Sequence, residues 1–450
     1  MKEVSIANVR AHNISPYFSS AYSSNNDALL DINNRITRNE SGQGLSWLEI
    51  LCDDFGHRKV GSTALEDAID WILKTSRAEG LSAHTEPVTG IPNWVRRHDR
   101  AFVLKPRIHR LNVLAIDGSP PGTVEGEVVL LRHYDEIPTA NVSGKIVVFS
   151  QDWKGYSRTA KYRKSAEKLE KRGAIAVLVS SVTPNSLYTA HTGAGARGSK
   201  IPAASIPPEE AQMIGRWLKR GISVRVRLDI TSTNLPEPTS SRNVILELKG
   251  TELEKEVVLL AAHVDTWDVG QGALDDGGGM AAIRQTLLAI KRYIDESPQN
   301  RLKRTIRGVF FTAEEQGNFG AKQYFADHRN TSEKFVFGVE TDQGAFRPKN
   351  YNSRFEFTGK ENQKSPMSKV VNDLNDLGYP ISLKDSPSQG QLKYLADTGV
   401  PTSIYVSDRG DDFYFQFHHS NADYSSVFEA EDIDQTAAML AIVALRFANQ

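Results

Sequence analysis

The sequence holds one cysteine, Cys52, in 450 residues. A single thiol can form neither an intrachain disulfide nor a metal site built from several thiolates. No apolar run approaches the roughly 20 residues that span a bilayer, so we expect no contact with a membrane interior. The first residues, Met1 to Ser5, also lack the long apolar core of a secretory signal. These facts alone leave the compartment open, with a cytoplasmic location as one alternative.

The chain also lacks an excess of either charge. Its 54 basic and 55 acidic residues leave a formal net charge of -1, which argues against a general affinity for nucleic acid or for anionic membranes. A hydrophobic content of 39% and a charged content of 24% are typical of a soluble globular protein. The length predicts two or three domains.

Local patterns divide the chain into four segments. Residues 1–44 are polar and predict an N-terminal arm, and residues 45–117 predict the first part of a main domain. In that part, Thr63 to Glu66 resembles a capping box that opens a helix ending near Gly80. Residues 118–235 predict an inserted module, and residues 236–450 the rest of the main domain.

The inserted module is expected to be rich in strands. Apolar runs predict strands at 128–131, 144–149, 174–179 and 224–228, and a charged helix is expected at 159–172. The turn-rich segment 233–240 predicts the linker back to the main domain.

The main domain alternates strands with helices. Residues 257–262, 305–312 and 335–339 predict buried strands, whereas the segments after Gly279 and from 437 to 445 predict helices. Alternation of this kind predicts an α/β fold with a mixed, mostly parallel sheet between helices.

Four polar clusters each follow an apolar or aromatic run in this domain. They are His263-Val264-Asp265 with Asp275-Asp276-Gly277-Gly278-Gly279, Glu314-Glu315, Glu340-Thr341-Asp342 and His418-His419-Ser420. Strand ends are where α/β sheets collect ligands, and imidazole with carboxylate is a donor set for divalent metals. The clusters together therefore predict a site for two metal ions.

Each cluster alone has a simpler interpretation. A lone His-x-Asp is usually a surface turn or a core histidine, and an Asp-Asp-Gly-Gly-Gly segment is usually the start of a helix. A Glu-Glu pair is normally solvated. Together they favour a metal site, because a metal neutralises carboxylates that are costly to bury.

The stretch from His263 to Gly279 closely resembles the di-zinc peptidase family of bacterial leucyl aminopeptidase and glutamate carboxypeptidase II. Glu314-Glu315, Glu340-Thr341-Asp342 and His418-His419-Ser420 match its other motifs in order and spacing. The resemblance implies the zinc exopeptidase fold, with residues 118–235 as an inserted protease-associated domain. It also implies a homodimer and a secreted or lysosomal location.

The resemblance implies a role for each polar residue. His263 and Asp342 would hold one Zn²⁺, Glu315 and His419 a second, and Asp275 would bridge the two. Glu314 would be the general base, Asp265 would orient His263, and His418 would stabilise the oxyanion. The Asp275–Asp276 peptide would be cis. Asp423 selects His419 over His418 as the ligand, because it lies four residues further on, as in the family.

We therefore expect a metallo-exopeptidase that hydrolyses short peptides, with dipeptidase or aminopeptidase action on free termini. A hydroxide that bridges the two metals would attack the carbonyl. One alternative is a catalytically inactive, receptor-like homologue, which predicts lost ligands. The other is a single-zinc acyl transferase similar to glutaminyl cyclase, which predicts loss of one metal's ligands. The chain retains all five ligands and a separate base.

Overall fold

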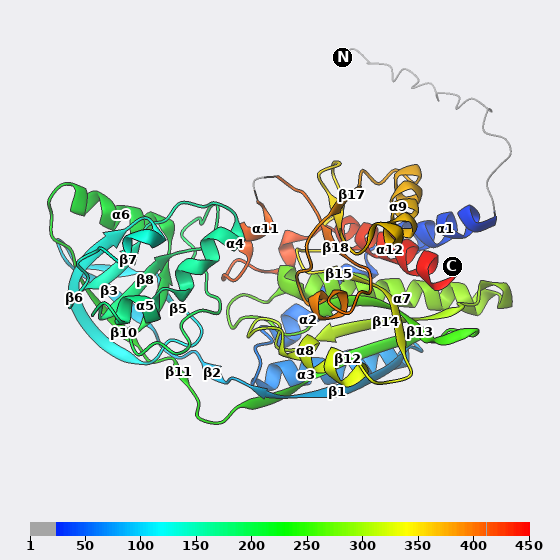
Figure 1. Cartoon of the computed structure of the whole chain (residues 1–450), viewed down its shortest axis with the longest axis horizontal. Coiled ribbons are helices and arrows are strands. Elements are labelled where there is room, and N and C mark those ends of the chain that lie inside the picture. The colour runs from blue at the N-terminus through cyan, green and yellow to red at the C-terminus, as the bar shows by residue number, and fades with distance from the viewer. Residues whose placement is uncertain (1–23, 411) are drawn as a thin grey trace, which may run out of the picture.

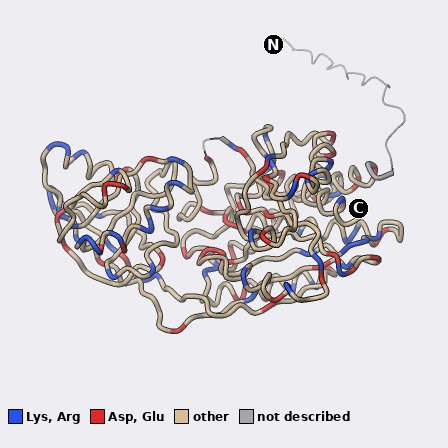
Figure 2. The backbone as a smooth tube through the Cα atoms, in the orientation of Figure 1, with Lys and Arg blue, Asp and Glu red and all other residues tan. Residues whose placement is uncertain are grey.

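The computed structural model describes residues 24–450 except residue 411. The chain builds two eight-stranded sheets, and Figure 1 shows them in two parts placed end to end. Within the described residues, no helix is long and apolar enough to cross a membrane. Basic and acidic residues are interspersed along both parts (Figure 2), in keeping with the near-zero net charge.

The main sheet confirms the predicted α/β class, with a parallel centre and antiparallel additions. Across the sheet its strands are β1 (Ser82–Ile91), β12 (Thr239–Leu248), β14 (Arg304–Phe311), β13 (Leu253–His263), β15 (Lys334–Thr341), β18 (Thr402–Val406), β16 (Arg354–Thr358) and β17 (Ser382–Asp385). Strands β14, β13, β15 and β18 run parallel to their neighbours in this group. Their carboxyl ends therefore meet at one edge of the sheet.

Alternation along β13 explains why helices cover both faces of this sheet. Val258, Leu260 and Ala262 pack into the core with α7 (Gly278–Glu296) and α12 (Ala430–Ala448). Leu259 and Ala261 face the other way, toward α8 (Phe319–His328) and α10 (Lys393–Ala396). Because successive side chains of a strand point to opposite faces, a continuous apolar run is buried on both sides.

The first core face is completed by helices from both ends of the chain. They are α1 (Ser24–Asn34), a π-helical turn (Arg35–Asn39), α2 (Gln43–Phe55), α3 (Thr63–Ala78) and α9 (Glu361–Asp376). Leu29, Ile32 and Ile36 are buried in this core, so residues 24–39 pack as part of the main domain rather than as an arm. The remainder of the expected arm, residues 1–23, lies outside the described residues. The cap of α3 is Ser62, which accepts from the Leu65 N–H, and not Thr63 as expected.

The second sheet forms the inserted module. Its strands, in order, are β4 (His109–Leu111), β3 (Arg100–Lys105), β10 (Arg225–Ile230), β6 (Gly122–Leu131), β7 (Ile146–Phe149), β8 (Ala176–Ser180), β9 (Ala203–Ile206) and β5 (Leu114–Ala115). Helix α6 (Pro208–Lys219) packs its apolar side on this sheet. The module thus recruits strands between residues 100 and 115 that precede the boundary expected at 118, because they pair with β10 and β9.

The expected helix at 159–172 is broken into three short pieces. They are α4 (Tyr156–Thr159), a 3-10 turn (Ala160–Lys164) and α5 (Ala166–Glu170). The turn brings Tyr162 and Arg163 inward, and both are buried. Charge along the sequence suggested a solvated helix, but tertiary contacts of these two side chains override that pattern.

Two short strands and an aromatic contact join the parts. β2 (Trp94–Val95) pairs with β11 (Thr233–Asn234), which lies in the expected linker. Where α4 approaches α11 (Tyr414–Phe417) in Figure 1, Tyr156 stacks on Phe415 at a ring separation of 5.0 Å. The module is therefore packed against the main domain and not merely tethered to it.

Candidate metal centre

Three neighbouring parallel strands end at the site. His263 is the last residue of β13, Asp342 directly follows β15, and Glu314-Glu315 come shortly after β14. Since these strands run parallel and adjacent, their carboxyl ends place the three clusters side by side, as the sequence predicted. His418 and His419 follow α11, and the Nε2 atoms of both lie close to Asp275.

The first donor group is centred on His263. Its Nε2 lies 3.0 Å from Asp275 Oδ1 and 3.2 Å from Asp342 Oδ1. Its Nδ1 lies 2.9 Å from the backbone oxygen of Asp265. Because a carbonyl only accepts, that contact keeps a proton on Nδ1 and directs Nε2 at the two carboxylates. His263, Asp275 and Asp342 can thus share one metal ion.

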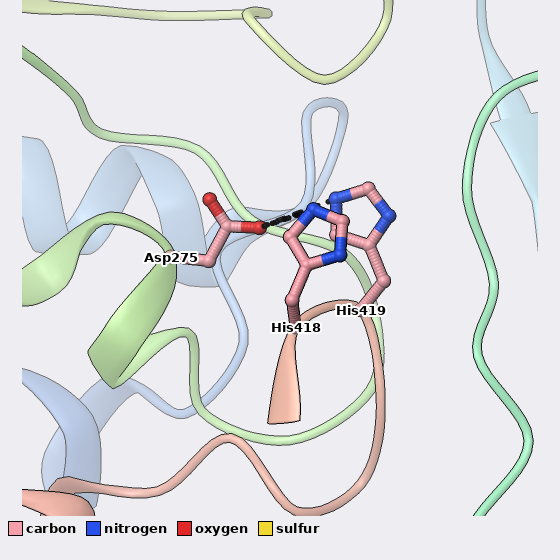
Figure 3. Close-up of side chains that lie close together, drawn as sticks. All are labelled: Asp275, His418 and His419. Carbon is pink, nitrogen blue, oxygen red and sulfur yellow. Dashed lines mark ion pairs between the residues drawn. The ribbon is translucent and has the colours of Figure 1, made fainter. Parts of the chain in front are cut away.

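The second donor group meets the other oxygen of Asp275. Asp275 Oδ2 lies 3.2 Å from His419 Nε2 and 3.6 Å from His418 Nε2, the arrangement shown in Figure 3. Glu315 Oε2 lies 3.0 Å from His419 Nε2, whereas its Oε1 is buried with no hydrogen-bond partner among the described residues. Asp275 therefore stands between two donor groups, one carboxylate oxygen toward each.

Hydrogen bonds to the backbone hold Asp275 in this position. The Asp423 carboxylate accepts the N–H groups of Leu274 at 2.6 Å and Asp275 at 3.3 Å. Asp276 accepts the N–H of His263 at 3.1 Å. The Asp275–Asp276 peptide is cis, as the family resemblance implied. The turn thus ties Asp275 to the end of β13.

Asp265 acts differently from expectation. Its carboxylate accepts the backbone N–H groups of Glu314 at 3.0 Å and Glu315 at 3.4 Å, while the nearest distance from this carboxylate to the His263 ring is 3.8 Å. The group that contacts the ring is the Asp265 carbonyl. The side chain instead positions the backbone of the Glu-Glu dipeptide, so one residue contacts both the His263 ring and the segment that carries the two glutamates.

The electrostatics of the cluster favour a divalent cation. In the described part of the chain, the ion pairs of Asp275, Glu315 and Asp342 are all with histidines, with no lysine or arginine in range. Burial, reinforced by neighbouring carboxylates, raises the pKa values of Glu314, Glu315 and Asp342. Such a cluster needs positive charge to ionise fully. Nitrogen and carboxylate donors in this arrangement suit Zn²⁺.

Comparison with known proteins places this geometry in a family. The model of Peptidase family M28 matches residues 243–444. Mouse carboxypeptidase Q is 36% identical over 410 residues, covering 88% of this chain and 84% of the mouse protein. Human carboxypeptidase Q is 36% identical over 409 residues, covering 88% and 83%. The chain belongs to peptidase family M28.

Solved structures agree with the M28 assignment. A peptidase M28 precursor from Shewanella amazonensis superposes with a TM-score of 0.87 at 29% identity, over 95% of this chain and 97% of that one. A zinc aminopeptidase from Bacillus subtilis shares the fold, with a TM-score of 0.68 at 17% identity over 91% and 95% of the two chains. The predicted family and enzyme class, a metallopeptidase, are confirmed.

Several residues at this M28 site escaped the sequence analysis. Arg58 is fully buried and donates to the carbonyls of Val264, Gln271 and Gly272, each at 2.9 Å. It thereby holds both ends of the loop between His263 and Asp275. Nothing in its local sequence marks it, since an arginine between a histidine and a lysine usually lies at the surface.

The inserted module also reaches the M28 site. The Thr192 N–H donates to the His419 carbonyl at 2.9 Å, and His191 Nδ1 lies 2.7 Å from the His418 carbonyl. His419 has a φ of 63°, in the left-handed region that residues other than glycine seldom adopt. The segment carrying both histidines is therefore held by the module.

Proposed function

We propose that this protein is a two-zinc exopeptidase that hydrolyses short peptides with free termini by dipeptidase or aminopeptidase action. One observation carries the proposal: Asp275 directs one oxygen at His263 and the other at His419. A single carboxylate placed between two histidine-containing groups is the arrangement that two divalent ions need. The ligands would be His263, Asp342 and Asp275 for one ion, and Glu315, His419 and Asp275 for the other.

Bound zinc would supply a water molecule of lowered pKa and polarise the scissile carbonyl. Glu314 would take the proton from that water and deliver it to the leaving amine. Asp265 fixes the backbone of Glu314 beside the ligand Glu315. Burial, with the charge of Asp342, raises the pKa of the Glu314 carboxyl, as a group that must both accept and release a proton requires.

His418 would donate to the oxygen of the scissile carbonyl. Its Nε2 lies beside Asp275, and its ring stacks on that of His419 at 3.4 Å. Burial and the charge of His419 lower the pKa of His418 well below the usual value, so the imidazole is neutral and serves as a hydrogen-bond donor. This hydrogen bond would strengthen as negative charge develops on the oxygen of the scissile carbonyl. Donors that act on developing charge accelerate a reaction most.

The names of the relatives support short peptides as the substrate class. Carboxypeptidase Q and the aminopeptidase that shares the fold are named as exopeptidases. We extend that specificity class to this chain.

The family resemblance further supports a homodimer that is secreted or lysosomal, with residues 118–235, extended by the strands from residue 100, as a protease-associated domain. These assignments are part of the proposal. The near-zero net charge fits a protein that acts on small peptides rather than on nucleic acid.

A dipeptide panel tests the function. The purified protein would be incubated with dipeptides that are free, amino-blocked or carboxyl-blocked, with and without a chelator. We expect cleavage of free dipeptides, a strong loss on amino blocking, and loss of turnover with chelator that zinc restores. Cleavage that does not depend on zinc, or no cleavage of any dipeptide in the panel, would refute the proposal. Absence of turnover would favour the receptor-like alternative, and cyclisation of an N-terminal glutamine would favour the acyl transferase.

A further inference from the structure

The ring of His419 is contacted on both of its nitrogens by groups that fix its proton. The indole Nε1–H of Trp267 lies 3.1 Å from His419 Nε2. An indole N–H can only donate, so this contact directs at the indole the Nε2 lone pair that a bound metal would take in its place. With its lone pair on Nε2, the ring carries its proton on Nδ1.

The acceptor for that proton belongs to the inserted module. His419 Nδ1 lies 3.3 Å from the backbone oxygen of Thr192. Arg163, which is 3% exposed, donates to the same oxygen through Nη1 and places that Nη1 3.1 Å from His419 Nδ1. Since a guanidinium has no lone pair to offer, the two N–H groups converge on one carbonyl. The carbonyl oxygen has two lone pairs and can accept both.

The surroundings of Arg163 hold its guanidinium group in this position. Its Nη2 donates to the Tyr156 hydroxyl at 2.6 Å. Gly193, with a φ of 144°, passes so close that a Cβ there would overlap Arg163 Nη1 and lie 3.0 Å from His419 Nδ1. Glycine is thus required for the module's backbone to reach the metal ligand.

The two halves of the centre differ in what orients their histidines. For His263 the carbonyl at Nδ1 is that of Asp265, two residues away in the same domain. For His419 it is that of Thr192, 227 positions away in the module. The five proposed ligands all lie in the matched M28 region, residues 243–444, but Arg163 and Thr192 lie outside it.

We propose that the inserted module completes the metal centre: the Thr192 carbonyl, held by the positioning residue Arg163, fixes His419 in the tautomer whose Nε2 can bind zinc. The inference rests on the proposed two-zinc function. Partners of this kind typically change metal affinity 10–100-fold when removed. Loss of Arg163 should therefore weaken one zinc site and leave the His263 site intact.

Zinc affinity of Arg163→Met tests the inference. The wild-type and variant proteins would be equilibrated with buffered Zn²⁺, and the metal per chain measured at each free concentration. We expect two zinc ions in the wild type, and in Arg163→Met one site with unchanged affinity and one weakened 10–100-fold. Titration with Co²⁺ should show the same split in its visible absorption bands. Arg225→Met, a change to a half-exposed arginine of the same module, should behave as the wild type.

A second variant guards against misfolding. Arg163→Lys keeps a positive donor that can reach the Thr192 carbonyl, and it should recover part of the lost affinity. Two sites of wild-type affinity in folded Arg163→Met would overturn the inference, as would equal weakening of both sites in folded Arg163→Lys. Failure of the proposed function would give a different result, because the wild-type protein itself would then bind fewer than two zinc ions.

Discussion

Arg58 offers a quantitative test of how the centre is assembled. In Arg58→Met the carbonyls of Val264 and Gln271 would lose this donor, and that of Gly272 would keep only the Gly277 N–H. Hydrogen bonds from a charged group contribute about 1.5–3 kcal/mol each, and burial of the guanidinium itself costs part of that gain. We therefore expect the loop from Val264 to Gly272 to lose about 3–5 kcal/mol of local stability.

Peptide-resolved amide exchange measures this loss directly. Every 1.4 kcal/mol is a factor of ten, so amides between His263 and Asp275 should exchange at least about 100-fold faster in Arg58→Met. Arg58→Lys should recover little, because an ammonium cannot reproduce the fork that spans three carbonyls. Arg225→Met is the surface control. An increase below tenfold in Arg58→Met would refute the assignment of the loop to this residue.

Two further predictions concern Asp423 and His328. Asp423→Ala should weaken zinc binding about 10–100-fold, since it frees the N–H groups of Leu274 and Asp275. Asp423→Asn should retain more affinity for zinc. Equal zinc affinity in the wild type and both variants would contradict this prediction. Away from the centre, hydrogen bonds from His328 and His84 outweigh burial and lower the pKa of Glu86 to about 2, while Glu86 and Glu333 outweigh burial and raise the pKa of His328. The stabilisation that Glu86 and His328 give the folded state is complete between pH 4.5 and pH 6.5, the ordinary pKa values of the two groups. It falls away as the pH drops toward 2, and it is lost as the pH rises through the folded pKa of His328. His328→Gln should therefore lower the free energy of unfolding by about 1 kcal/mol near pH 5.5, after allowance for solvent screening, and by little at pH 9; a pH-independent difference in urea unfolding would count against it.

The sequence was sufficient for the central strands of the main sheet and for the clusters at their ends. Residues 257–262 are a continuous apolar run, and a buried strand that leads to His263 follows from that pattern alone. The approach of Glu314, Asp342 and His263 then follows from the parallel order of β14, β13 and β15. Asp275 was found in the glycine-rich turn after His263, and the bridging role expected for it came from the resemblance to the family motif.

The groups that support the proposed ligands could not be predicted, because they depend on contacts between distant segments. Arg58 and Arg163 have the local sequence of surface residues, yet both are buried beside the site. The start of the module was expected at 118, but strands from residue 100 join its sheet by pairing with β10. Such pairings, and the recruitment of Thr192 to His419, depend on tertiary structure and leave no periodic signal.

The central claim is that two zinc ions are held independently of the group that moves the proton. Glu314→Gln tests it most directly, by zinc content and dipeptide hydrolysis measured on one sample. We predict two zinc ions per chain and a turnover number reduced about 10²–10⁴-fold, the usual contribution of a general acid–base group. Turnover close to that of the wild type, or loss of zinc together with activity, would contradict the account.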